Sequence, residues 1–186
     1  SGLGSSSTFT VGLLNALHAM KHQMVTKREL AINAINLEQN IIGEAVGSQD
    51  QTAAAFGGLN LIEFNKQQTF QVQQMTISEE RLKLLQDNLL LCFTGFSRTA
   101  EKVAKSQIES TPNKEKELYM MLEILNEAKE AIIDDKISID EFGKLLNEQW
   151  LLKRSLTEHI SNPDIDEIYK AGIDAGAIGG KLLGAG

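Results

Sequence analysis

The sequence predicts an α+β fold in two parts, a mixed first part and a helix-rich second part. Apolar residues recur at helical spacing through most of the chain, whereas two short segments near its middle alternate apolar and polar residues, as half-buried strands do. The predicted strands follow one another instead of alternating with helices. A largely antiparallel sheet is therefore favoured over a doubly wound parallel one.

The first part is predicted to begin with two helices. Apolar stripes at helical spacing run through residues 8–20 and 26–43. Thr26 is a suitable N-cap for the second helix, and Glu29, three residues later, completes the pattern of a capping box. The stripe of the first helix consists of Phe9, Leu13, Leu14, Leu17 and Met20.

The strand signals follow. Segments 59–65 and 68–77 alternate apolar and polar residues around Asn65-Lys66-Gln67, which predicts a β-hairpin. The polar, glycine-rich residues before them are interpreted as a loop with a short alanine-rich turn. The continuous apolar run 88–96, NLLLCFTGF, is more typical of a buried strand. Its Cys92 is expected to be a small buried hydrophobe.

The second part is predicted to be mostly helical from Ser97 onward. Pro112 and Pro163 stand near expected helix starts, where proline is tolerated. The last segment, AIGGKLLGAG, is predicted to be a strand entering a loop. A boundary near residue 86 divides the chain into predicted domains 1–86 and 87–186. The predicted helices cover residues 98–109, 114–134, 138–153 and 164–175.

Composition excludes several classes of protein. A net charge of -7 disfavours a nucleic-acid binder. No apolar stretch reaches the roughly 18 residues needed to cross a membrane, and the chain does not open with a secretory signal. The single cysteine allows no disulfide framework and suits a reducing cytosol, so a cytoplasmic protein is expected. Both ends lie in glycine-rich loops, from which we expect a piece of a longer protein with its ends missing. The oligomeric state stays open, a homodimer being one option.

The first residues, Gly2-Leu3-Gly4-Ser5-Ser6-Ser7, are chemically suited to hold a phosphate group. A helix start leaves backbone N–H groups unpaired and carries the positive end of the helix dipole. Glycines let an anion approach the backbone, and serine hydroxyls add donors. The loop lacks the Gly-Lys-Ser/Thr end of a Walker A motif and is not a GxGxxG turn. A plain serine N-cap after a flexible terminus is the alternative reading.

Three motifs in this order resemble those of the GHMP kinases. GLGSSS resembles their phosphate-binding loop, although Thr8 stands where alanine is usual. VGSQDQTAAAFGGLN resembles their segment with an acidic residue near the transferred phosphate, and GGKLLGAG resembles their C-terminal glycine motif. The resemblance implies a two-domain GHMP kinase fold, with an S5-domain-2-like N-terminal part and a ferredoxin-like, helix-rich C-terminal part. It also implies ATP and Mg²⁺ as cofactors.

Within that family, the segments GSQDQ, AAAFGGLN, FTGFSR, LLNEQWLLKRSL and ISNPDIDEIY resemble those of the bacterial D-glycero-D-manno-heptose 7-phosphate kinases. This resemblance implies transfer of the ATP γ-phosphate to the anomeric hydroxyl of the heptose 7-phosphate. The 1,7-bisphosphate formed would serve the synthesis of nucleotide-activated heptose for surface polysaccharide. An L-fucokinase-like enzyme, a non-catalytic ligand-binding relative and a helical interaction module over residues 97–175 are the alternatives.

The resemblance assigns the chemical step to three residues. Asp50 is expected to act as the catalytic base or to position the acceptor hydroxyl, since placing that oxygen is most of the work in phosphoryl transfer. Ser6 and Glu38 are expected to hold Mg²⁺, which favours one or two carboxylates plus substrate phosphates. The alternatives are an Asx turn for Asp50 and a solvated helix face for Glu38.

Three further residues are expected to bind the sugar phosphate. Gln51 is expected to hydrogen-bond sugar hydroxyls. Arg98, just after the predicted strand, could pair with a phosphate through two parallel hydrogen bonds, and Lys181 could act as a point charge. Surface ion pairs are the alternative for both cations.

Overall fold

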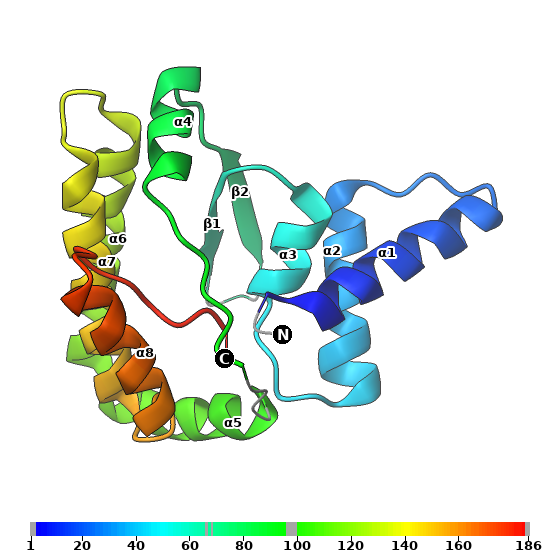
Figure 1. Cartoon of the computed structure of the whole chain (residues 1–186). Coiled ribbons are helices and arrows are strands. Elements are labelled where there is room, and N and C mark those ends of the chain that lie inside the picture. The colour runs from blue at the N-terminus through cyan, green and yellow to red at the C-terminus, as the bar shows by residue number, and fades with distance from the viewer. Residues whose placement is uncertain (1–2, 66, 68, 96–99, 185–186) are drawn as a thin grey trace. The chain divides into compact units, whose positions relative to one another are not determined.

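A computed structural model of the chain describes residues 3–65, 67, 69–95 and 100–184. The chain divides into two compact units, Ser1–Met75 and Thr76–Gly186, and each is considered by itself. Helices dominate both (Figure 1), and the sheet of the described residues is a single two-stranded hairpin. The predicted α+β class is confirmed as a helix-rich fold with a small sheet.

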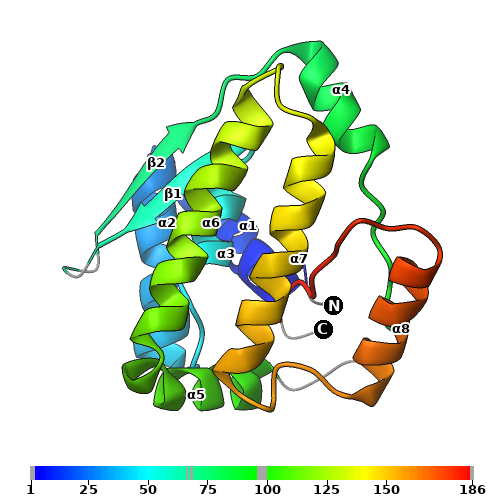
Figure 2. The ribbon, with the colours of Figure 1, turned by 90° about the vertical axis from the view of Figure 1, so that its left-hand side faces the viewer.

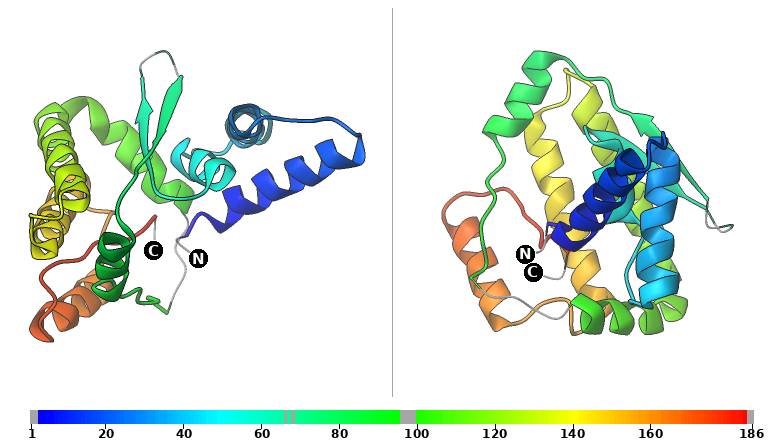
Figure 3. Two further views of the ribbon diagram at one scale, coloured as in Figure 1. Left: turned by 90° about the horizontal axis from the view of Figure 1, so that it is seen from above. Right: turned by 90° about the vertical axis from the view of Figure 1, so that its right-hand side faces the viewer.

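The first unit is built on three helices in mutual contact (Figure 3). Their buried core consists of Val11, Leu30 and Ala34, with Ala54 and Ala55 packed against it. The alanines carry almost no side chain, so the helix backbones can approach closely at this core. The helices of this unit are α1 (Ser5–Met20), α2 (Lys27–Asn36), the π-helix η1 (Leu37–Ile42) and α3 (Gln49–Phe56).

The start of α2 is the predicted capping box. The Thr26 hydroxyl accepts a hydrogen bond from Glu29 N at 3.1 Å, and the Glu29 carboxylate accepts one from Thr26 N at 2.9 Å. These side chains satisfy backbone donors that a helix start leaves free. The helix continues directly into η1, which ends at Gly43 in the left-handed region with φ +83°.

The first helix forms where its spacing predicts, but with another face inward. Ser7 and Val11 are its buried residues. Four residues of the apolar stripe are 43–77% exposed, namely Phe9, Leu13, Leu17 and Met20. Spacing therefore identifies the helix without showing which face meets the core.

The predicted hairpin is confirmed as β1 (Asn60–Phe64) and β2 (Phe70–Gln74). The strands are antiparallel, with Asn60 opposite Gln74 and Phe64 opposite Phe70. Phe70 anchors the hairpin, since it is buried, meets the Phe56 ring edge to face at 6.2 Å and lies 4.8 Å from the Arg28 guanidinium.

The second unit contains five helices and one 3₁₀ turn in its described residues. Its core consists of Trp150, Leu156, Ile160 and Ile165. Trp150 is fully buried. Helices α6 and α7 run side by side (Figure 2). The elements are α4 (Glu79–Asp87), α5 (Ala100–Ser110), η2 (Thr111–Asn113), α6 (Glu115–Ile133), α7 (Ile139–Leu156) and α8 (Pro163–Asp174).

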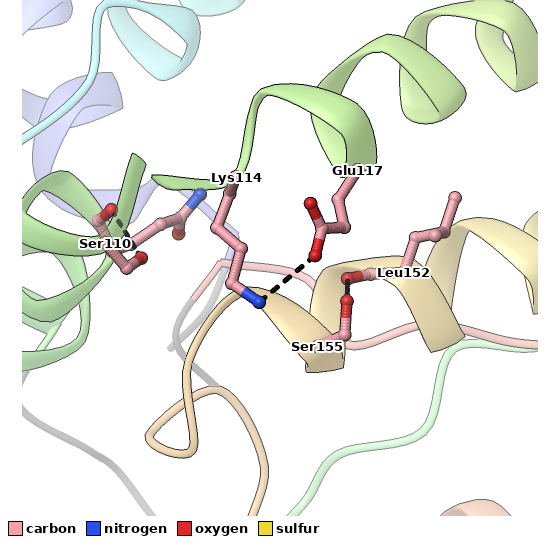
Figure 4. A network of polar contacts seen from close by, with 6 residues as sticks. Ser110, Lys114, Glu117, Leu152 and Ser155 are labelled. Carbon is pink, nitrogen blue, oxygen red and sulfur yellow. Dashed lines mark hydrogen bonds and ion pairs between the residues drawn. The ribbon is translucent and has the colours of Figure 1, made fainter. Parts of the chain in front are cut away.

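Local polar contacts hold the helix ends of this unit. Figure 4 shows the junction of η2 with α6, where Lys114 Nζ lies 3.2 Å from a Glu117 carboxylate oxygen. Asn162 caps α8 by accepting a hydrogen bond from Ile165 N at 2.8 Å, and Pro163 occupies the first turn as predicted.

The buried strand predicted over residues 88–96 is wrong for the residues that the structure describes. Residues 88–95 form no helix or strand. Leu89, Leu90, Leu91 and Phe93 are 53–88% exposed, and Cys92 is exposed instead of buried. An apolar run measures what a segment would gain from burial, whereas burial also needs a neighbour that covers it.

Three further segments differ from prediction. Residues 79–87 and 49–56 form helices that the sequence reading missed. Residues 177–184 form no strand. This last segment crosses α7 instead, so closely that a Cβ on Gly179 would lie 2.1 Å from the Gly143 carbonyl oxygen.

Candidate active site

The N-terminus of α1 presents unpaired backbone amides. Gly4 is its N-cap, with φ +65° and no side-chain cap, and the first helical hydrogen bond runs from Thr8 N to Gly4 O at 2.8 Å. The amides of residues 5–7 therefore have no acceptor in the helix, and they lie at the positive end of its dipole. Leu3, Ser5 and Ser6 are exposed around them, and Gly2 lies outside the described residues. This end of α1 has the chemistry of an anion site.

Glu38 lies behind that N-terminus as a buried carboxylate. It is 2% exposed, in the first turn of η1, and its Oε2 accepts a hydrogen bond from Ser7 Oγ at 2.9 Å. The solvated helix face considered for Glu38 is thereby excluded. Among the described serines of the loop, Ser7 and not Ser6 is the one that hydrogen-bonds Glu38.

A second donor reaches the same carboxylate. Gln51 is fully buried, and its Nε2 lies 2.5 Å from Glu38 Oε2. Glu38 Oε1 is also buried but has no hydrogen-bond partner among the described residues. Because a buried carboxylate oxygen without a partner is costly, this atom is suited to meet a cation. In the part of the chain that the structure describes, no three His, Cys, Asp or Glu side chains form a metal cluster, so the phosphates of a nucleotide would have to complete such a site.

Asp50 lies at the mouth of α1. Gly4 packs against it so closely that a Cβ on Gly4 would be 3.0 Å from both Asp50 Cγ and Oδ2. Its carboxylate is exposed and belongs to the first turn of α3. The loop predicted for the stretch around Asp50 is therefore wrong, and so is the alternative of an Asx turn, because Asp50 lies in a helix.

The loop before α3 determines where Asp50 and Gln51 lie. Gln39 Nε2 donates to Val46 O at 2.9 Å and to Ser48 Oγ at 3.1 Å, which ties the loop to η1. Thr52 Oγ1 donates to Ser48 O at 2.8 Å. Consecutive residues of an α-helix point about 100° apart, so Asp50 can face the anion site while Gln51 faces the interior.

Lys181, one of the two predicted phosphate-binding cations, belongs to the second unit. Lys181 is half-buried in the segment that crosses α7, and burial lowers the pKa of its amino group. Arg98 lies outside the described residues.

Sequence reasoning overlooked the contacts of Ser7 and the inward direction of Gln51. The run of alanines after Gln51 is the signal that could have shown this. Alanine is the strongest helix former, so the run favours a helix in which Asp50 and Gln51 share one turn. From the sequence, this run is instead interpreted as a turn within a loop.

Two family models match the two parts of this chain. The GHMP kinases N terminal domain matches residues 1–58, and the GHMP kinases C terminal model matches residues 116–186. The chain belongs to the GHMP kinase family. The resemblance noted in the sequence is thereby confirmed, and the expected class of enzyme, an ATP-dependent phosphotransferase, agrees with the family. Because the two models leave residues 59–115 unmatched, the domain boundary near residue 86 stays a prediction.

The relatives of this GHMP kinase chain include sugar kinases. It is 33% identical to a D-glycero-alpha-D-manno-heptose 7-phosphate kinase of Campylobacter jejuni, over 100% of the chain and 55% of that protein. It is 26% identical to a bifunctional fucokinase/GDP-fucose pyrophosphorylase of Arabidopsis thaliana, over 18% of that protein. A solved D-glycero-D-manno-heptose 1-phosphate kinase from Bacteroides thetaiotaomicron superposes with a TM-score of 0.72 at 29% identity, over all of this chain and 51% of the other. The chain thus spans about half the length of the heptose kinases that it matches.

Proposed function

We propose that the protein is an ATP-dependent sugar kinase that phosphorylates the anomeric hydroxyl of D-glycero-D-manno-heptose 7-phosphate to the 1,7-bisphosphate. The observation that carries the proposal is the meeting of Asp50 with the open N-terminus of α1 at Gly4. The proposed general base, the Asp50 carboxylate, thereby lies beside amides that can hold phosphate. The likeness to the heptose 7-phosphate kinase of Campylobacter jejuni supports the choice of sugar.

In the proposed reaction the amides of residues 5–7 hold phosphate oxygens of ATP. The sugar hydroxyl oxygen attacks the γ-phosphorus while the bond from that phosphorus to the β-phosphate oxygen breaks. Asp50 orients the hydroxyl and accepts its proton. The role proposed for Lys181 and Arg98 is to bind the distal phosphate of the sugar.

Ser6 and Glu38 are the proposed residues for Mg²⁺. Glu38 Oε1, which has no partner among the described residues, supports this role, and the Ser6 side chain is exposed where a solvated ion can reach it. When bound, the metal would neutralise charge on the transferred phosphoryl group. A cytoplasmic location follows from the proposed use of ATP and a sugar phosphate. The described helices include none long and apolar enough to span a bilayer.

The test is a coupled ADP-release assay on the full-length protein with ATP and Mg²⁺. The acceptors are the heptose 7-phosphate, the heptose 1-phosphate, mannose 6-phosphate, mannose, fucose and galactose. Turnover confined to the heptose 7-phosphate is expected, with ³¹P NMR showing a new anomeric phosphate. Asp50→Asn should lose about 10²–10⁴-fold in kcat. Asp87→Asn, which changes an exposed carboxylate on α4, is the matched control.

The likeness to the fucokinase gives a second candidate substrate, a free sugar. Turnover of fucose in preference to the heptose phosphate would support it. Binding of ATP without turnover of any sugar would instead support a non-catalytic relative and overturn the proposal.

A further inference from the structure

The side chain of Gln51 lies in the interior of the first unit and not in the exposed site. It is fully buried, and its amide nitrogen is directed at Glu38 Oε2. A side chain in this place has no surface for a sugar hydroxyl, so the role expected from the sequence does not suit it. Among the described residues, its one hydrogen-bond partner is the carboxylate proposed to hold the metal.

We infer that Gln51 is a positioning residue, which with Ser7 fixes Glu38 Oε2 so that Oε1 is presented to Mg²⁺. The inference rests on the proposed function, because it assigns a supporting role at the proposed metal site. It replaces a direct substrate contact for Gln51 with an action through Glu38.

The two carboxylate oxygens of Glu38 differ in their hydrogen bonds. Both donors, Ser7 Oγ at 2.9 Å and Gln51 Nε2 at 2.5 Å, converge on Oε2. Within the part of the chain that the structure describes, Oε1 accepts no hydrogen bond, although it is buried. Two donors on one oxygen fix the rotation of the carboxylate, and a fixed, unpaired oxygen is the one available as a ligand.

The chemistry of glutamine at position 51 suits this role. Its NH₂ group must face the carboxylate, because the amide oxygen would repel Glu38 Oε2. Glutamate at this position would bring two carboxylates together in the interior, where like charges are most costly. A neutral donor of this length holds the Glu38 carboxylate in place without adding a second charge beside it.

The neighbouring positions Asp50 and Gln51 thus have separate tasks on one turn of α3. Asp50 is exposed against Gly4, whereas Gln51 is buried against Glu38. A substitution at Asp50 should slow the chemical step, whereas a substitution at Gln51 should raise the metal concentration that activity requires.

The test compares wild type, Gln51→Met, Ser7→Ala and Gln49→Leu in the full-length protein. Methionine keeps the length of glutamine without its donor, and Gln49 is an exposed glutamine at the start of the same helix. Mn²⁺ titrations followed by electron paramagnetic resonance, with a non-hydrolysable ATP analogue bound, measure the Kd of the metal. The Mg²⁺ concentration for half-maximal activity is the second readout.

Gln51→Met is expected to raise the Mn²⁺ Kd and the half-maximal Mg²⁺ concentration about 10-fold or more, the range typical of residues that orient a metal ligand. Ser7→Ala should raise both severalfold, and Gln49→Leu should leave both unchanged. Metal-free nucleotide should bind all four proteins alike. A Gln51→Met protein that is folded by circular dichroism and binds Mn²⁺ like wild type overturns the inference alone.

A crystal structure of the wild type with Mn²⁺ tests the same point without any variant. Anomalous scattering should place the ion on Glu38 Oε1, with Gln51 Nε2 still on Oε2. An ion on Oε2 with Gln51 displaced would overturn the inference while keeping the metal site. A wild-type protein that binds no Mn²⁺ with the nucleotide would overturn both the inference and the proposed role of Glu38.

Discussion

Gly4 and Asp50 lie in direct contact across two helices of the first unit. The Gly4 backbone has φ +65°, and a Cβ there would stand 3.0 Å from the Asp50 carboxyl group. The glycine is therefore required twice, once for its left-handed backbone and once for the space that Asp50 fills. The N-terminus of α1 and the proposed base, Asp50, therefore lie side by side.

Gly4→Ala is expected to impair catalysis more than folding. The left-handed conformation of alanine costs about 1–2 kcal/mol, and the added methyl group displaces Asp50. A displacement of this size should lower kcat about 10–100-fold. Steady-state kinetics and urea unfolding measure the two effects. Gly12→Ala, which changes a helical glycine with open space around it, should keep full activity. An active Gly4→Ala protein would show that the contact with Asp50 has no catalytic role.

Gly179→Ala is expected to release residues 177–184 from α7. The new Cβ would lie 2.1 Å from Gly143 O and 2.8 Å from Asn147 Cβ, so the segment must move away. Leu182, which packs against the core of the second unit, should move with it. We expect a loss of about 1–3 kcal/mol in the free energy of unfolding and faster proteolysis of the segment.

The matched control for that variant is Gly172→Ala. Gly172 lies inside α8, and a Cβ there meets nothing within 4 Å. Alanine should stabilise this helix by up to about 1 kcal/mol. Equal stability of the Gly179→Ala protein and wild type would contradict the tight crossing.

Arg81→Met is expected to destabilise the second unit. Arg81 is 4% exposed, and its guanidinium donates to the carbonyl oxygens of Ala131 and Ile132 at the end of α6 and of Ile137 in the loop that follows. Methionine would leave these acceptors without a donor and remove a cation from the negative end of the helix. We expect a loss of about 2–4 kcal/mol in urea unfolding.

Lys83→Met provides the comparison on the same helix α4. Lys83 forms an exposed ion pair with Asp87, so its loss should cost less than about 1 kcal/mol. Similar effects of the two substitutions would show that Arg81 is not a specific cap of α6.

Lys181→Met is expected to raise stability at neutral pH and to weaken binding of the sugar phosphate. Burial lowers the pKa of this amino group below 10.5, which means that the charged form is disfavoured in the folded state. Between the folded pKa and 10.5 the unfolded chain binds more protons, so wild-type stability rises with pH there. The advantage of the methionine variant is largest below that window and shrinks as the pH rises through it.

Thermal melts at pH 7 and pH 10 measure this effect. A rise in Tm of roughly 2–4 °C is expected at pH 7 and a smaller one at pH 10. Lys170→Met, which removes an exposed lysine of α8 paired with Asp174, should show no such narrowing. A constant difference at both pH values would contradict the cost of burying Lys181.

Local signals in the sequence determined much of this molecule. The capping box of Thr26 and Glu29, the hairpin around Asn65 and the proline at the start of α8 depend on residues a few positions apart. Their free energies act within one turn, so a short window contains the information. The glycine-serine loop and the GSQDQ segment likewise identified the family from contiguous residues.

Tertiary structure alone decided the rest, because it depends on which distant groups meet. The spacing of α1 could not show that Ser7 and Val11 face inward, nor that Ser7 reaches Glu38, 31 residues away. The apolar run at Leu89–Phe93 has the composition of a buried strand, yet its side chains are exposed. Gln51 has a polar side chain of the kind that contacts ligands, yet the packing of α3 directs it toward Glu38. Residue type sets what a group gains from burial or a hydrogen bond, and the fold sets which partner is within reach.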